Sequence, residues 1–197
     1  HMWLRPGVDA SCAMTAGGGA WRGLMNSYVP VVLAHSGQAA PAIGLLVTGA
    51  NVAALIGSAT SKWVQALGFR SAVLLGLLPA GIGIGLTGLF SGHVAVVAVT
   101  LFLAGLGAGV LQTVGPALAA DSVEPEERGD AIASNGTFRA ATLLIAPLGV
   151  GALVLVLPIG TALGVAGALI LLPSAVVARR RRPAQTPHGP SNHSAHV

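Results

Sequence analysis

One arginine lies deep inside a long apolar segment, where its charge has to be explained. Arg139 comes about ten residues after Asp130, the start of a helix predicted over residues 130–153. At 1.5 Å per residue it is roughly 15 Å into a segment where charge in lipid is costly. Asn135 precedes it by four residues and Thr142 follows by three, so all three share one helical face. We expect Arg139 and Asn135 to face protein or water, and to line a path for a polar solute.

Four more polar side chains in predicted helices are candidates for the same path. Arg22 and Asn26 are four residues apart in a helix predicted over 17–34, and Arg22 is shallow enough to reach the headgroup region. Asn51 and Gln112 lie in two other apolar segments. Amides in such segments also hydrogen-bond between helices, contributing about 0.6 kcal/mol each. Helix packing and solute contact therefore both remain open for Asn51 and Gln112.

No pattern indicates covalent chemistry or a bound cofactor. The glycines at 83, 85 and 88 have dinucleotide-loop spacing, but no strand precedes them and no acidic residue follows at the required distance. Ser91 and His93 lie in a short turn that offers no buried site to orient them. The single cysteine has no companion, and three histidines lie in a polar tail with no fold to order them. We predict no enzyme activity, cofactor or metal site.

The elements that must position these residues are apolar runs of about 20 residues. The chain is 53% hydrophobic and 8% charged, whereas soluble domains carry roughly a quarter charged residues. Each run is near the length that a bilayer core requires. We predict helices over 17–34, 41–61, 71–90, 93–119, 130–153 and 160–178. The predicted fold class is an all-α integral membrane protein of about six transmembrane helices, with the lipid bilayer as its main partner.

Basic residues fall on one side of this predicted bundle. The termini and the second and fourth connections contain Arg5, Lys62, Arg70, Arg128 and the arginines at 179–182. The other three connections contain no lysine or arginine. Five spans would place the arginine run opposite the other cations. The positive-inside rule therefore predicts six spans in the inner (plasma) membrane, with both termini cytoplasmic.

Three parts of the chain follow from this topology. Residues 1–16 are predicted to be an N-terminal cytoplasmic segment, 17–178 the transmembrane domain, and 179–197 a basic and then disordered cytoplasmic tail. The arginine run directly follows an apolar segment, which is typical of a topology signal rather than of nucleic-acid binding. Trp21 and Trp63 are expected near the membrane interfaces.

Small residues indicate close helix packing. Three predicted helices carry glycines four residues apart, a spacing that lets membrane helices approach closely: Gly81 and Gly85, Gly105 and Gly109, Gly160 and Gly164. These faces could pack inside the chain or against a second membrane chain. A small membrane subunit or scaffold that transports nothing is therefore the alternative to a transporter.

Two connections carry a family pattern. The acidic segment from Asp121 to Asp130 contains Pro125-Glu126-Glu127-Arg128-Gly129, and Ala146-Pro147 with Gly149 follows in the next helix. The segment from Ser61 to Arg70 keeps a late glycine and arginine, but lacks the first glycine, the aspartate and a basic residue. These connections resemble the P-x-E-R-G and G-x-x-x-D-R-x-G-x-R loops of major facilitator superfamily transporters.

The resemblance implies a fold and a function. Members have twelve helices in two halves, each half a pair of inverted three-helix repeats, and hold a small-molecule substrate between the halves. Erosion of the Ser61–Arg70 loop resembles the C-terminal half, so we expect a fragment or truncated transporter whose partner is the missing six-helix half or another membrane chain. The expected function is secondary active transport of a small solute by alternating access.

The cytoplasmic charges could latch one conformation of such a transporter. The residues concerned are Lys62, Arg70, Asp121, Glu127 and Arg128. A solvated loop, with exposed pairs contributing about 0–1 kcal/mol each, explains them equally well. All six acidic residues are Asp9 or lie between Asp121 and Asp130, so proton or sodium coupling through a carboxylate is expected in the absent half. The positive interior favours anionic or polar solutes.

Overall fold

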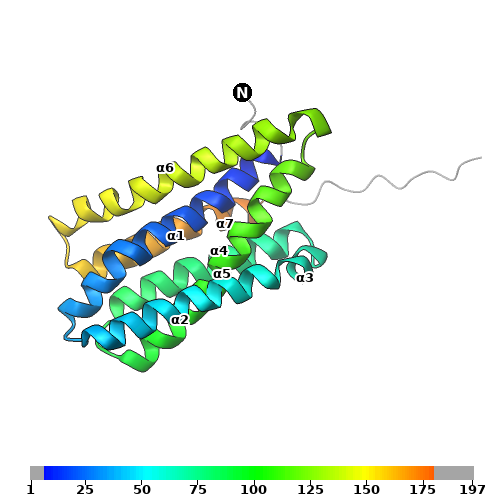
Figure 1. Ribbon diagram of the computed structural model, residues 1–197. Helices are drawn as coiled ribbons and strands as arrows, with labels where there is room; N and C mark the ends of the chain where they lie inside the picture. The colour runs from blue at the N-terminus through cyan, green and yellow to red at the C-terminus, as the bar shows by residue number, and fades with distance from the viewer. Residues whose placement is uncertain (1–6, 180–197) are drawn as a thin grey trace, which may run out of the picture.

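The computed structural model describes residues 7–179, and this part of the chain is entirely helical (Figure 1). Six long helices are joined by short connections, two of which contain a further short helix or turn. In chain order they are α1 (Val8–His35), α2 (Ala40–Ala59), the short α3 (Ser61–Ala66), α4 (Phe69–Leu89), α5 (Val94–Asp121), the 3-10 turn η2 (Pro125–Glu127), α6 (Arg128–Val154) and α7 (Ile159–Arg179). The predicted break between the last two helices is confirmed, because a turn and Pro158 separate α6 from α7.

The first helix begins earlier than predicted, at Val8 rather than near residue 17. Asp9 Oδ1 accepts hydrogen bonds from the backbone N–H groups of Gly7 (3.0 Å) and Ala10 (2.7 Å), and its charge suits the positive helix N-terminus. Val8 and Cys12 pack in a small apolar cluster with Ala119 and Ala131. Polar residues lower the hydropathy of this first part, yet Ser11 and Thr15 are buried against other helices rather than exposed.

Four helical segments in the described part of the chain are long and apolar enough to cross a membrane. They are Ala40–Ala59, Arg70–Leu89, Val94–Asp121 and Pro125–Val154. The more polar α1 is not among them, and the apolar part of α7, Ile159–Ser174, is shorter. Since a lipid-exposed backbone must satisfy its hydrogen bonds internally, this all-helical architecture fits a multi-pass membrane protein.

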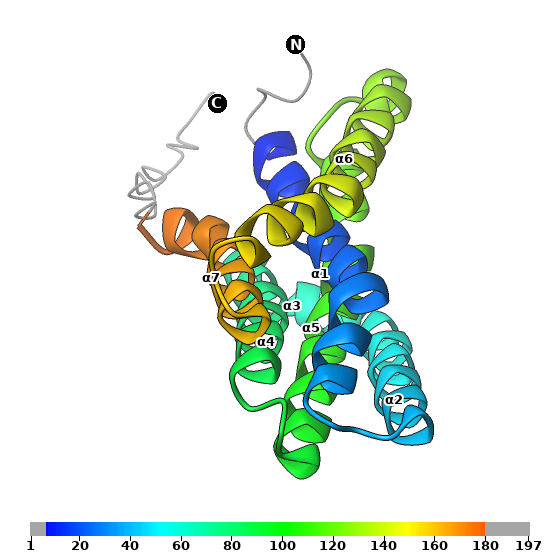
Figure 2. The same cartoon turned by 90° about the vertical axis from the view of Figure 1, so that its left-hand side faces the viewer.

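The helices form two rows. One row runs α6, α1, α5, α2, each packed on the next, and the other consists of α4 and α7, which pack on each other. Helix α4 also packs on α5 and α1, joining the rows. Figure 2 shows α4 and α7 on one side of the bundle and α1 and α2 on the other. Helix α1 contacts every other long helix and lies at the centre.

Glycines let α4 and α7 approach closely, as their spacing predicted. A Cβ on Gly88 would lie 2.5 Å from the Gly160 carbonyl oxygen, and a Cβ on Gly167 would lie 2.5 Å from that of Gly81. Glycines at 105 and 109 pack in the same way on the α2 backbone. The 105/109 face is filled by α2 inside the chain, whereas Gly81, Gly85 and Gly164 line an open groove of about 430 Å³ between α4 and α7.

Trp21 is not at an interface. Its side chain is fully buried in the main core, and its indole Nε1 has no hydrogen-bond partner in the described part of the protein. The earlier start of α1 places Trp21 near the middle of the helix, which explains the wrong prediction. Trp63, by contrast, is 77% exposed on α3, at the end of the bundle.

The connections meet at the two ends of the bundle. At one end Ser36 and Gln38, after α1, hydrogen-bond to Ser91, after α4, with Ser36 Oγ to Ser91 Oγ at 2.6 Å. The opposite end holds α3, η2 and the beginnings of α1, α4 and α6, with the acidic segment and Lys62, Arg70 and Arg128 (Figure 1). Arg5, the arginines at 180–182 and the three tail histidines lie outside the described residues.

Candidate functional site

A line of polar side chains runs between α1, α5 and α6 inside the otherwise apolar bundle. We call it the polar seam, and define it as Ser11, Thr15, Gln112, Asn135, Arg139 and Thr142. Ser11 Oγ donates to the Gly115 carbonyl oxygen on α5 at 2.7 Å and accepts a hydrogen bond from Asn135 Nδ2 on α6. Ser11 and Asn135 are both buried. One serine thus connects three helices.

Arg139 joins the seam from α6. Its Nη2 donates to Gln112 Oε1 on α5 at 3.2 Å, which brings together two residues 27 positions apart in the sequence. Arg139 is half-buried, so its charge is neither in bulk water nor sealed in the core. The predicted face is confirmed in its geometry, since Asn135 and Arg139 both point toward the α1–α5 side.

The backbone of α1 comes unusually close to α6 beside this arginine. A Cβ on Gly19 would lie 2.6 Å from the Arg139 carbonyl oxygen, and one on Gly23 would lie 2.6 Å from that of Leu143. Thr142 Oγ1 donates to the carbonyl oxygens of Phe138 (2.9 Å) and Arg139 (3.1 Å) in its own helix. The missing side chains of Gly19 and Gly23 therefore allow α1 and α6 to hold the seam together.

Sequence reasoning missed two members of the seam, Ser11 and Thr15. Both precede the predicted start of the first helix, so neither was considered part of the membrane domain. A signal was available, because Ser11, Thr15, Gly18 and Gly19 recur at helical spacing along one face. Thr15 Oγ1 lies against Gly115, is buried, and has no hydrogen-bond partner among the described residues.

The other predicted path residues are outside this network. Arg22 and Asn26 continue the α1 face of Ser11 and Thr15, but Arg22 is half-buried and Asn26 is exposed. Asn51 lies on α2, at the far edge of the row, and its Nδ2 donates to the Val47 carbonyl oxygen of the same helix at 2.8 Å. Helix packing accounts for that bond, and the structure does not bring Asn51 to the seam.

The predicted latch residues gather at the charged end of the bundle. Lys62 lies on α3, Arg70 in the first turn of α4, and Asp121 at the end of α5. Glu127 and Arg128 follow at the η2–α6 junction. A 170 Å³ pocket between α3, α4 and α5 is lined by Gln65, Ala72, Val114, Leu118 and Asp121. The two connections are therefore placed at one end, while the latch itself stays a prediction.

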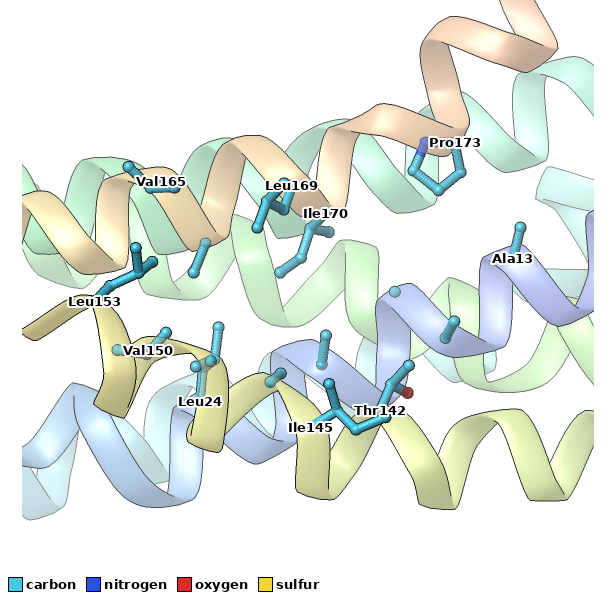
Figure 3. Close-up of a pocket in the computed structure, with 16 residues that line it drawn as sticks. Ala13, Leu24, Thr142, Ile145, Val150, Leu153, Val165, Leu169, Ile170 and Pro173 are labelled. Carbon is cyan, nitrogen blue, oxygen red and sulfur yellow. The ribbon is translucent and has the colours of Figure 1, made fainter.

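An apolar cavity of about 480 Å³ lies between α1, α6 and α7 (Figure 3). Its α1 wall comes from Ala16, Ala20 and Leu24, which lie on a different face from Ser11 and Thr15. The cavity thus uses a different face of α1 from the polar seam, and the two share Thr142 on α6. With Thr142 as the one hydroxyl among its described lining, the cavity offers no polar ligand set for a solute.

An apolar helical bundle with a polar seam inside it defines a polytopic membrane protein. The sequence model of the Major Facilitator Superfamily matches residues 10–196, and the chain belongs to this family. A comparison with curated proteins gave no match. Family membership implies membrane transport of small solutes. It also accounts for the two charged connections, which resemble loops of this family.

Proposed function

We propose that this chain is the C-terminal six-helix half of a secondary active transporter that moves a small solute by alternating access. The polar seam is the observation that carries the proposal. A membrane helix tolerates an arginine where it serves a solute or ion pathway, or where it is paired. Arg139 is held by one uncharged amide, between three helices that come from different parts of the chain.

The packing of helices supports two repeats of three, α1-α2-α4 and α5-α6-α7. The first helix of each set packs on the second helix of the other, as α1 on α6 and α5 on α2. The third helices, α4 and α7, pack on each other. This exchange is expected for paired repeats in transporters, which hold substrate where the repeats meet near the bilayer midplane.

A six-helix half needs a second body against which to rock. The proposed partner is the other half, either encoded upstream or supplied by another chain. Large apolar side chains on α2 and α6 are exposed and available to lipid or to that partner: Leu45, Leu55, Leu144 and Leu148 are among them. The proposed topology has both termini in the cytoplasm of a cell whose plasma membrane contains the protein.

A non-transporting scaffold has less support. A scaffold would dock through its glycine faces, and four of these glycines, Gly81, Gly105, Gly109 and Gly160, pack against the backbone of neighbouring helices; the open groove at Gly81, Gly85 and Gly164 is the surface left for docking. Genomic sequence upstream of the chain separates the two functions. Six more in-frame helices favour the transporter, and a start codon at Met2 with no companion gene favours the subunit.

Uptake into vesicles tests the role of Arg139. The chain, assembled with its other half, is screened for uptake of labelled solutes, and Arg139→Ala is compared with wild type. Loss of a hydrogen bond to a charged group of the solute costs about 1.5–3 kcal/mol, which is roughly a 10- to 150-fold loss of affinity.

Thr137→Ala is the matched control for this assay. Thr137 is exposed on α6, points away from the seam, and hydrogen-bonds to Ala133 of its own helix at 3.0 Å. Its substitution should leave uptake unchanged. Equal uptake by Arg139→Ala and Thr137→Ala would remove Arg139 from the pathway.

The latch at the charged end is proposed separately. Arg70 and Glu127 are both half-buried at this end of the bundle, and each has an interaction with other groups. Arg70→Glu should slow transport, and Glu127→Arg in the same chain should restore it if the two charges meet during the cycle. Additive losses in the double variant would count against the latch.

A further inference from the structure

Within residues 7–179, no acidic side chain balances the charge of Arg139. The described residues include all six acidic ones, and none of them forms an ion pair with Arg139. Asp130 lies about two and a half turns earlier on α6, roughly 14 Å along the axis. Asp9 is at the beginning of α1. It lies a similar distance along the helix axis from Gly18 and Gly19, the α1 residues that lie against Gln112 and Arg139.

The guanidinium also has donors to spare. It carries five N–H donors, and within the described part of the chain it makes one hydrogen bond, to Gln112 Oε1. An unpaired cation in a poorly hydrated site is unfavourable, and a carboxylate or phosphate group satisfies both the charge and two N–H groups at once. A neutral solute would leave the positive charge of Arg139 unbalanced, and a cationic solute would add a second positive charge beside it.

The rest of the seam offers further donors. Thr15 Oγ1 is buried without a partner, on the α1 face that also carries Gly18 and Gly19 beside Gln112 and Arg139. Ser11 and Asn135 are already paired with each other, so their positions are set before any solute arrives. Since Ser11 is already paired, the Thr15 hydroxyl is the seam group on α1 that is left to donate to a new partner.

We infer that the polar seam binds an anionic group of the transported solute, a carboxylate or a phosphate, with Arg139 as its principal ligand and Thr15 as a secondary one. That the bound solute is transported rests on the proposed function, whereas the binding of an anionic group at the seam does not.

Binding is tested on the purified full chain by thermal unfolding at constant ionic strength. The probes are benzoate against benzamide, succinate against succinamide, and inorganic phosphate. Each carboxylate is thus compared with a neutral compound of similar shape, which separates charge recognition from apolar contact. A ligand that binds the folded chain raises its Tm in proportion to ln(1 + [L]/Kd).

Three variants identify the ligand residues. Arg139→Gln should abolish the rise in Tm with anions. Arg139→Lys keeps the charge and should retain a smaller rise, because an ammonium group lacks the two-pronged geometry. Thr15→Val removes an unpaired hydroxyl, so it should unfold no earlier than wild type without ligand while its rise with anions is reduced. Thr137→Ala should behave as wild type.

Two outcomes overturn the inference. If no probe stabilises wild type more than Arg139→Gln, the seam does not select anions, and uptake of neutral or cationic solutes in vesicles would still leave the transporter assignment standing. If anions stabilise the chain alone but not its complex with the other half, the group that balances Arg139 is an acidic side chain of that half. Anion binding without any uptake supports the seam as an anion site and contradicts transport instead.

Discussion

Two glycines on α7, Gly164 and Gly167, allow the close packing of α4 and α7 to be tested. Each is replaced with alanine in a separate variant, and the stabilities of the two variants are compared. A Cβ on Gly167 would lie 2.5 Å from the Gly81 carbonyl oxygen and 2.6 Å from the Gly85 backbone nitrogen. Both neighbours are backbone atoms, so the clash is relieved only if the helices move apart. At Gly164 the nearest atom to a new Cβ is Leu89 Cδ2 at 3.6 Å, an ordinary contact.

The expected difference follows from two effects. Replacing a helical glycine with alanine gains about 0.5–1 kcal/mol from backbone conformational preference, and this gain applies at both positions. Overpacking at Gly167 costs about 1–3 kcal/mol, and the cost at Gly164 is absent. Gly167→Ala should therefore be about 1–3 kcal/mol less stable than Gly164→Ala. For a chain of this size that is roughly 2–12 °C in Tm.

The single cysteine supplies the assay. Cys12 is 3% exposed, so a fluorogenic maleimide should label it only as the bundle unfolds. Labelling is followed during heating of both variants and of wild type in the same detergent. Gly164→Ala should unfold at or above the wild-type temperature and Gly167→Ala below it. Equal temperatures for the two variants would refute the close approach of α4 and α7.

Three further predictions use the same chain. Asn135→Leu removes the hydrogen bond to Ser11, so it should lower the free energy of unfolding by about 0.6–1.7 kcal/mol. Its Tm should be lower than that of Thr137→Ala. An unchanged Tm would show that this hydrogen bond does not stabilise the bundle. Trp21→Phe should lower the Tm, because the smaller ring leaves a cavity in the core, and removal of the buried unpaired N–H should offset part of that cost; a Tm above wild type would show that the unpaired N–H outweighs the packing. Lys62→Cys and Gln38→Cys, each in a Cys12→Ala chain, should react with an impermeant maleimide from opposite sides of the membrane, and labelling of both from one side would contradict the topology.

The helical class and most helix ends were predictable from the sequence because they depend on local properties. Runs of apolar residues of bilayer length are recognised without knowing their neighbours, and α4, α5, α6 and α7 begin and end within about two residues of the predicted bounds. The weak break near Pro158 was recovered from charge placement. Close glycine packing was also predictable, although the partner of each glycine face was not.

The start of α1 and the membership of the seam were not predictable in the same way. Ser11, Thr15 and Trp21 have ambiguous hydropathy, and their burial depends on which helices lie against them. Gln112 and Arg139 could each be chosen as polar residues in apolar helices, but only the tertiary structure places one against the other.

The sequence alone determined that the chain is a helical membrane protein with most of its cations in the termini or in or beside the connections, because hydrophobicity and charge act residue by residue. The tertiary structure decided which polar residues belong together. It joins Ser11, Gln112, Asn135 and Arg139 through packing that glycines make possible, and it separates Asn51 from them. Contacts between helices distant in sequence are set by the shapes of whole faces, which no single segment contains.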